Sequence, residues 1–137
     1  MTRELTTTAL LSNLGQVMSF VDQSFGEMGV AGPAAFAMKL AIEEICTNIM
    51  SYAYPAEAGP IHLVMEAAPE TLTVRIADRG TPFRPEDAPE PDLTSSAEER
   101  RIGGLGIHLV RQMLDEVEYR TDPVEGNTLR LVKNLEH

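Results

Sequence analysis

Two polar residues with complementary chemistry, Glu44 and Asn48, stand four positions apart in the largely apolar stretch 40–54. On a helix this spacing places the two side chains one turn apart on the same side. A carboxylate can take a proton or orient a hydroxyl group, and a carboxamide oxygen can ligate a hard cation such as magnesium. Both residue types are also common on solvated helix faces, so this stretch alone leaves a catalytic pair and a plain polar surface open.

The apolar residues around this pair predict the helix that would carry it. They recur at the i, i+3, i+4, i+7 spacing of a helix with one face on the core. We expect this helix to begin near Ala34, after a break at Gly32-Pro33, and to end before Tyr54-Pro55. Glu43 lies about 100° around the helix from Glu44, so it is expected outside the site. The apolar stripe consists of Ile42, Ile45, Cys46, Ile49 and Ala53.

Length and composition narrow the class of protein. The chain has 137 residues, a size that suits one domain with a substantial core, and we expect that domain to span residues 1–134. A formal charge of -10 has the wrong sign for covering a phosphate backbone, which disfavours nucleic acid as a partner. The single cysteine, Cys46, is expected to be a buried core thiol.

The two ends of the chain carry no feature of a membrane or secreted protein. The N-terminal residues lack the apolar core of a signal peptide, and no apolar run approaches the roughly 20 residues that span a bilayer. We therefore expect a cytoplasmic protein without a membrane partner. Residues 135–137, Leu-Glu-His, resemble the remnant of an expression tag.

The remaining elements are predicted from periodicity and from turn residues. Residues 3–9 are typical of a strand at a sheet edge, and residues 11–28 of a helix that ends at Gly29. A hairpin of two strands follows. Its strands are expected over 61–67 and 71–78, and two closing strands over 117–121 and 127–133, around a turn at Gly126-Asn127.

Between the hairpin and the closing strands, residues 80–103 form a long irregular segment with four prolines. A segment of this kind inside a compact domain is usually functional or disordered. It ends at a glycine cluster, residues 103–106, that runs into an amphipathic helix. Free N–H groups at such a helix start can bind phosphate, but an ordinary hinge with a helix cap remains an alternative.

Taken in order, these motifs resemble those of the Bergerat-fold (GHKL) ATPase superfamily, which includes gyrase, MutL and the histidine kinases. Residues 41–48 are similar to its N box, and residues 78–83 to its first glycine box. Residues 104–106 resemble its second glycine box, and residues 126–129 its closing strand motif. Within the superfamily, the length of the chain and the Asp-x-Gly-x-Pro-Phe sequence resemble the small bacterial anti-sigma factor serine kinases. Pro82 replaces the second glycine of the usual first box.

The resemblance implies a fold and a set of roles. The fold is a two-layer α/β (α+β) sandwich, with a mixed, mostly antiparallel sheet and helices on one face. Glu44 would be the general base for a seryl hydroxyl, and Asn48 would hold magnesium at the phosphates. Asp78 would accept a hydrogen bond from the adenine amino group, with Gly80 letting the adenine lie close and Thr128 supporting either Asp78 or a water beside the adenine.

The resemblance also assigns the contacts to the triphosphate. Residues 83–102 would form a lid over ATP. Either Arg100 or Arg101 would reach the γ-phosphate, and Arg101 is the residue that we assign to this contact. The backbone that wraps the triphosphate would come from Gly104, Leu105 and Gly106.

The activity implied is that of an ATP- and magnesium-dependent protein-serine kinase. Its substrate would be a STAS-domain anti-anti-sigma protein, and it would regulate a sigma factor or similar target by partner switching. A homodimer is left open. Two alternatives also remain: a nucleotide-dependent binding module without catalysis, and an ATPase that transfers phosphate to water.

Overall fold

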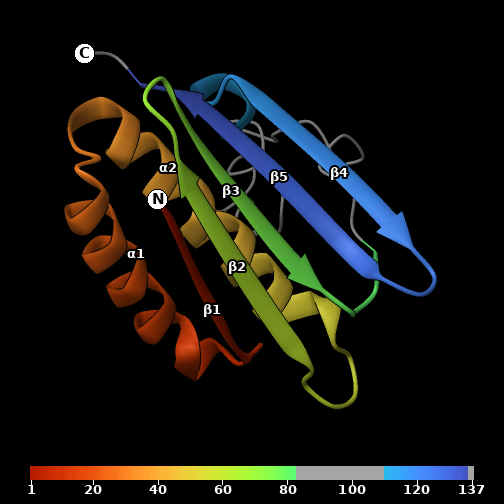
Figure 1. Ribbon diagram of the computed structural model, residues 1–137. Coiled ribbons are helices and arrows are strands. Elements are labelled where there is room, and N and C mark those ends of the chain that lie inside the picture. Colours follow the sequence, from red (N-terminus) through yellow and green to blue (C-terminus); the bar gives the residue numbers. More distant parts are fainter. Residues whose placement is uncertain (83–109, 136–137) are drawn as a thin grey trace, which may run out of the picture.

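The computed structural model describes residues 1–82 and 110–135. These residues form one five-stranded sheet with two helices packed on one of its faces (Figure 1). The expected two-layer α+β architecture is therefore confirmed. The elements in chain order are β1 (Thr2–Thr8), the 3-10 turn η1 (Leu11–Asn13), α1 (Leu14–Met28), α2 (Gly32–Asn48), the π-helical turn η2 (Ile49–Ala53), β2 (Pro60–Ala67), β3 (Thr71–Asp78), β4 (Glu116–Asp122) and β5 (Gly126–Asn134).

The strands lie in the order β1-β2-β3-β5-β4, with β1 at the edge, as the sequence predicts. All four strand pairs in the described part of the chain are antiparallel, so the sheet has no parallel pair there of the kind that a mixed sheet contains. The reason lies in the connection from β1 to β2. It contains two helices that run in opposite directions, and the chain therefore re-enters the sheet reversed.

Helix α1 ends where the sequence predicts, because Gly29 takes the left-handed conformation with φ 72°. Helix α2 begins earlier than predicted. Gly32 and Pro33 open it instead of preceding it, because proline's fixed φ and missing N–H suit the first turn of a helix. After Asn48 the helix widens into η2, which ends at Ala53, before Tyr54-Pro55, as expected.

The core lies between the helices and the alternate residues of the sheet that face them. Strands β2 and β3 follow the predicted period of two, with Leu63 and Val74 among residues that are fully buried. Cys46 of α2 is also fully buried, as predicted, and burial raises the pKa of its thiol to about 12. No helix among the described residues has the length and apolar character needed to cross a bilayer.

The turn between β4 and β5 comes earlier in the chain than the predicted turn at Gly126-Asn127. Residues 123–125 form it, and Gly126, with φ 91°, is the first residue of β5. The Asp122 carboxylate accepts hydrogen bonds from the N–H groups of Val124 and Glu125, at 2.7 and 2.9 Å. These bonds fix the turn and lower the pKa of Asp122.

Candidate functional site

Glu44 and Asn48 line one cavity of about 420 Å³ on the side of α2 away from the core. The predicted pairing of the two side chains is therefore present. Glu43 lines the same cavity, which corrects the expectation that it lies outside the site. Two side chains that lie about 100° apart around a helix would not share a narrow site. This cavity is wide enough for both glutamates to line it. The other residues that line it are Leu40, Thr47 and Tyr52.

The Asn48 side chain has unused hydrogen-bonding capacity. Its Nδ2 atom is buried and has no hydrogen-bond partner among the described residues, where it is the only buried side-chain nitrogen or oxygen in this state. Leaving such a group unpaired costs about 1–3 kcal/mol, so its presence calls for a ligand or another explanation. Rotating the amide by 180° exchanges its nitrogen and oxygen, so this position can present either atom to a ligand.

Asp78, at the end of β3, is the second predicted site residue that the fold buries, with 8% of its surface exposed. Its Oδ1 atom accepts hydrogen bonds from the Gly80 N–H at 2.8 Å and from Asn127 Nδ2 at 3.0 Å. Within residues 1–82 and 110–135, both hydrogen bonds to this carboxylate go to Oδ1. Its Oδ2 atom is thus available to accept a bond from a ligand.

The residue that supports Asp78 is Asn127, and the expected contact with Thr128 is absent. In the pairing of β3 with β5, Asp78 lies opposite Asn127, whereas Thr128 lies opposite Ala77 and belongs to the other face of the sheet. Asn127 is 3% exposed, and its Nδ2 atom also donates to the Gly80 carbonyl at 2.9 Å. The alternation of side chains along a strand could have indicated that Asn127 faces Asp78, because Asn127 lies on the same face of β5 as the core residues Leu129 and Leu131.

Gly80 joins the end of β3 to the end of the helix that carries Asn48. A Cβ atom at this position would overlap the carbonyl group of Ala53, the last residue of η2. Next to it, the Thr81 N–H donates to the same Ala53 oxygen at 2.7 Å. Glycine is therefore required for a close approach of two backbones, which fixes Asp78 relative to the helix.

Tyr54 is a supporting residue that the sequence pattern did not indicate, since its only predicted role was to follow the end of a helix. Its hydroxyl donates to the Pro60 carbonyl at 2.6 Å and accepts from the Arg79 N–H at 2.7 Å. These bonds tie the start of β2 and the end of β3, beside Asp78, to η2. Burial, and to a smaller degree the negative charge of Asp78, raise the pKa of Tyr54.

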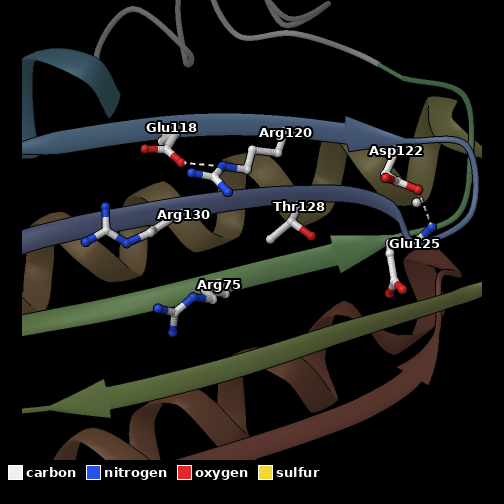
Figure 2. A pocket seen from close by; sticks show the side chains of 8 residues that line it. Arg75, Glu118, Arg120, Asp122, Glu125, Thr128 and Arg130 are labelled. Atoms are coloured by element: carbon white, nitrogen blue, oxygen red, sulfur yellow. Dashed lines mark hydrogen bonds and ion pairs between the residues drawn. The ribbon is translucent and has the colours of Figure 1, made fainter.

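A larger cavity, of about 520 Å³, lies on the sheet face turned away from the helices (Figure 2). Figure 2 shows Thr128 there among charged side chains from β3, β4 and β5. Its arginines are paired: Arg75 with Glu66 at 2.9 Å and Arg120 with Glu118 at 2.7 Å. Among the described residues, none that lines this cavity has a buried polar side-chain atom without a partner, in contrast to Asn48 on α2.

Several predicted residues lie outside the described part of the chain. They are the lid over 83–102, the arginines Arg100 and Arg101, and the triphosphate contacts Gly104, Leu105 and Gly106.

The residues present fit a nucleotide with a divalent cation. Asn48 offers a buried amide, Asp78 a buried carboxylate with a free oxygen, and Gly80 a surface without a side chain. No cluster of three His, Cys, Asp or Glu residues occurs in the described residues. A single amide ligand suits magnesium, which usually takes one or two protein ligands together with phosphate oxygens and water.

Comparisons with known proteins agree with this geometry. The family model of the histidine kinase-like ATPase domain matches residues 7–133. The serine-protein kinase RsbW of Bacillus cereus (strain AH187) is 32% identical over 119 residues, which cover 79% of this chain and 72% of the relative. The kinase of the same name from Bacillus anthracis has the same identity and coverage.

A solved structure shows the same fold. The histidine kinase domain of the blue-light activated histidine kinase from Erythrobacter litoralis EL346 superposes with a TM-score of 0.56 at 19% identity. The match covers 90% of this chain and 60% of that one. The chain therefore belongs to the histidine kinase-like ATPase family, and within that family it is similar to the RsbW serine-protein kinases.

Proposed function

We propose that the protein is an ATP-dependent protein-serine kinase that phosphorylates a STAS-domain anti-anti-sigma protein. The observation that carries the proposal is the cavity on α2, where Glu44 and the buried, unpartnered amide of Asn48 lie together. The similarity to RsbW serine-protein kinases supports the class of reaction. A sigma factor or similar regulator would be the second partner, bound alternately with the first.

Glu44 acts as the general base in this proposal. Its carboxylate takes the proton of the acceptor seryl hydroxyl as the hydroxyl oxygen forms its bond to the γ-phosphorus of ATP. The bond between that phosphorus and the β,γ-bridging oxygen breaks, and ADP leaves with the bridging oxygen. A positioned base of this kind contributes about 10²–10⁴-fold to the rate.

Asn48 and Asp78 position the nucleotide. Asp78 Oδ2 accepts a hydrogen bond from the adenine amino group, while hydrogen bonds from Asn127 Nδ2 and the Gly80 N–H hold Oδ1 in place. Asn48 would hold magnesium, and the ion would supply positive charge to neutralise the phosphates. Gly80 holds Asp78 in place, because its N–H donates to Asp78 Oδ1 and its lack of a side chain lets the backbone lie close to Ala53.

The binding-module and ATPase alternatives differ from the kinase in what Glu44 does. A module that only binds nucleotide has no use for a base, whereas here a carboxylate lines the cavity beside Asn48. An ATPase would use the same base on water. The acceptor of the phosphate therefore distinguishes all three functions.

The test is to incubate the purified protein with γ-labelled ATP, magnesium and the STAS-domain proteins encoded near its gene. We expect label on one serine of one of these proteins. Release of labelled phosphate without labelled protein would indicate the ATPase. Nucleotide binding without either product would indicate the binding module, and absence of binding in calorimetry would refute the whole proposal.

A further inference from the structure

The outward side of α2 carries exposed apolar side chains beside the cavity that contains Glu44. Phe36 is 65% exposed and Leu40 is 37% exposed, whereas Ile42 on the same helix is fully buried. Positions 36, 40, 43 and 47 follow one another at spacings of three and four, so they form one row along the helix. Most large apolar side chains of α2 face the core, and this row is an exception that requires a partner or another explanation.

This row is continuous with the rim of the cavity. Leu40, together with Tyr52, which is 57% exposed, lines the cavity that also holds Glu44. A hydroxyl must come within about 2.6–3.2 Å of a base to lose its proton to it. A protein that delivers a seryl hydroxyl to Glu44 must therefore lie against the side chains at the mouth of the cavity.

The row also carries a carboxylate that is available to a partner. Glu43 lines the cavity and is exposed, and it forms no salt bridge with any other described residue. Its backbone carbonyl accepts a hydrogen bond from the Thr47 hydroxyl at 2.6 Å, so this bond does not involve the carboxylate, which can pair with a partner protein. A negative charge at the edge of an apolar surface favours a lysine or arginine on the partner.

We propose that Phe36, Leu40, Glu43 and Tyr52 form the docking surface for the phosphate acceptor protein. Its occupant is the segment that carries the acceptor serine, with an apolar side chain against Phe36 and Leu40 and a basic side chain against Glu43. This inference rests on the proposed kinase function and adds the surface that selects the substrate. Phe36 lies outside the residues that line the cavity, so a change there should act on binding of the acceptor and leave ATP binding and chemistry unchanged.

The test is steady-state phosphotransfer from ATP to the STAS-domain protein that the unmodified kinase labels. The variants are Phe36→Gln and Phe36→Lys, because Phe36 is exposed, lies outside the residues that line the cavity, and both replacements are good helix formers. We expect each to raise the KM for the acceptor about 10-fold, the usual effect of removing a well-packed interface residue. The kcat and the KM for ATP should stay within about twofold.

Val124→Gln is the matched control. Val124 is also an exposed apolar residue, with 75% of its surface accessible, but it lies in the turn between β4 and β5 and not on α2. It should leave the acceptor KM unchanged, and thermal melting should show all variants folded. An unchanged acceptor KM in the α2 variants would overturn the docking surface while leaving the kinase intact. A fall in kcat or in ATP affinity of the same size would also overturn it. Absence of transfer by the unmodified protein would instead refute the kinase function, and the docking surface with it.

Discussion

The two faces of the sheet differ in the burial and pairing of their polar side chains. On the helix-facing side, Asp78 and Asn127 are buried and hydrogen-bonded to each other, and Asn48 Nδ2 is buried without a partner among the described residues. On the open side, the partly exposed Arg75 is paired with Glu66, and the exposed Arg120 is paired with Glu118, a pair that Figure 2 shows. The open side has the larger cavity, but the helix side has the unused hydrogen-bonding capacity.

This contrast shows which property identifies the site. Exposed ion pairs contribute only about 0–1 kcal/mol each, and forming or breaking them does not require a ligand. A buried polar atom without a partner is costly, so a protein that keeps one has a use for it. Volume alone would favour the open face instead.

The largest expected effect is that of Glu44→Gln. Removing the base should lower phosphotransfer by roughly 10²-fold or more, and nucleotide affinity should remain near normal because the change is isosteric. The control is Glu118→Gln on the open face, which should leave transfer unaffected. If Glu43→Gln lowers kcat more than Glu44→Gln does, the base has been assigned to the wrong glutamate of this cavity.

The next effect is that of Asp78→Asn, measured by calorimetry with ATP and ADP. Loss of a charged acceptor for the adenine amino group should weaken both nucleotides about 10-fold or more. Inosine triphosphate, which lacks that amino group, should be affected less. Asp122→Asn is the matched control, because Asp122 also accepts backbone N–H bonds at a strand end but lies at the open-face cavity. Equal affinity loss in both variants would contradict the assignment.

A smaller effect is expected for Gly80→Ala. The new methyl group would overlap the Ala53 carbonyl, so the end of β3 must move away from η2. Strain of this kind usually costs about 1–3 kcal/mol, which chemical denaturation can measure, and ATP binding should weaken with it. Gly15→Ala in α1, where a Cβ atom meets nothing within 4 Å, should instead stabilise by up to about 1 kcal/mol. Similar stability in the two variants would show that Gly80 is not at a close contact.

The smallest effect concerns Cys46, which lies in the core between the helices and the sheet. With a pKa of about 12 in place of 9.0, its thiol should resist alkylation at pH 8 until the protein unfolds. Since the folded pKa is raised, the stability that the protonated thiol contributes is fully present below pH 9 and is lost as the pH rises to about 12. A Cys46→Ala variant should lose less stability over that range. Rapid alkylation of the native protein would contradict the burial.

Local pattern was sufficient to predict most of the fold. The alternation over 71–78 gave the bounds of β3, and the apolar spacing around residues 40–54 gave the core face of α2 together with Glu44 and Asn48 on one side. These features depend only on the period of a strand or a helix, which a sequence displays directly. The start of α2 was missed because Gly32-Pro33 is equally compatible with a break and with a first turn.

The tertiary structure alone decided which residues meet at the site. The register of β5 against β3 placed Asn127, and not Thr128, opposite Asp78, and a shift of one residue exchanges the two faces of a strand. The contact of Gly80 with Ala53 and the shared cavity of Glu43 and Glu44 likewise depend on how separate elements pack. The sequence by itself determined the residue types, their spacing and the elements that carry them. Only the packing of those elements determined their partners, because contacts between distant segments are set by strand register and by the distance between helix and sheet.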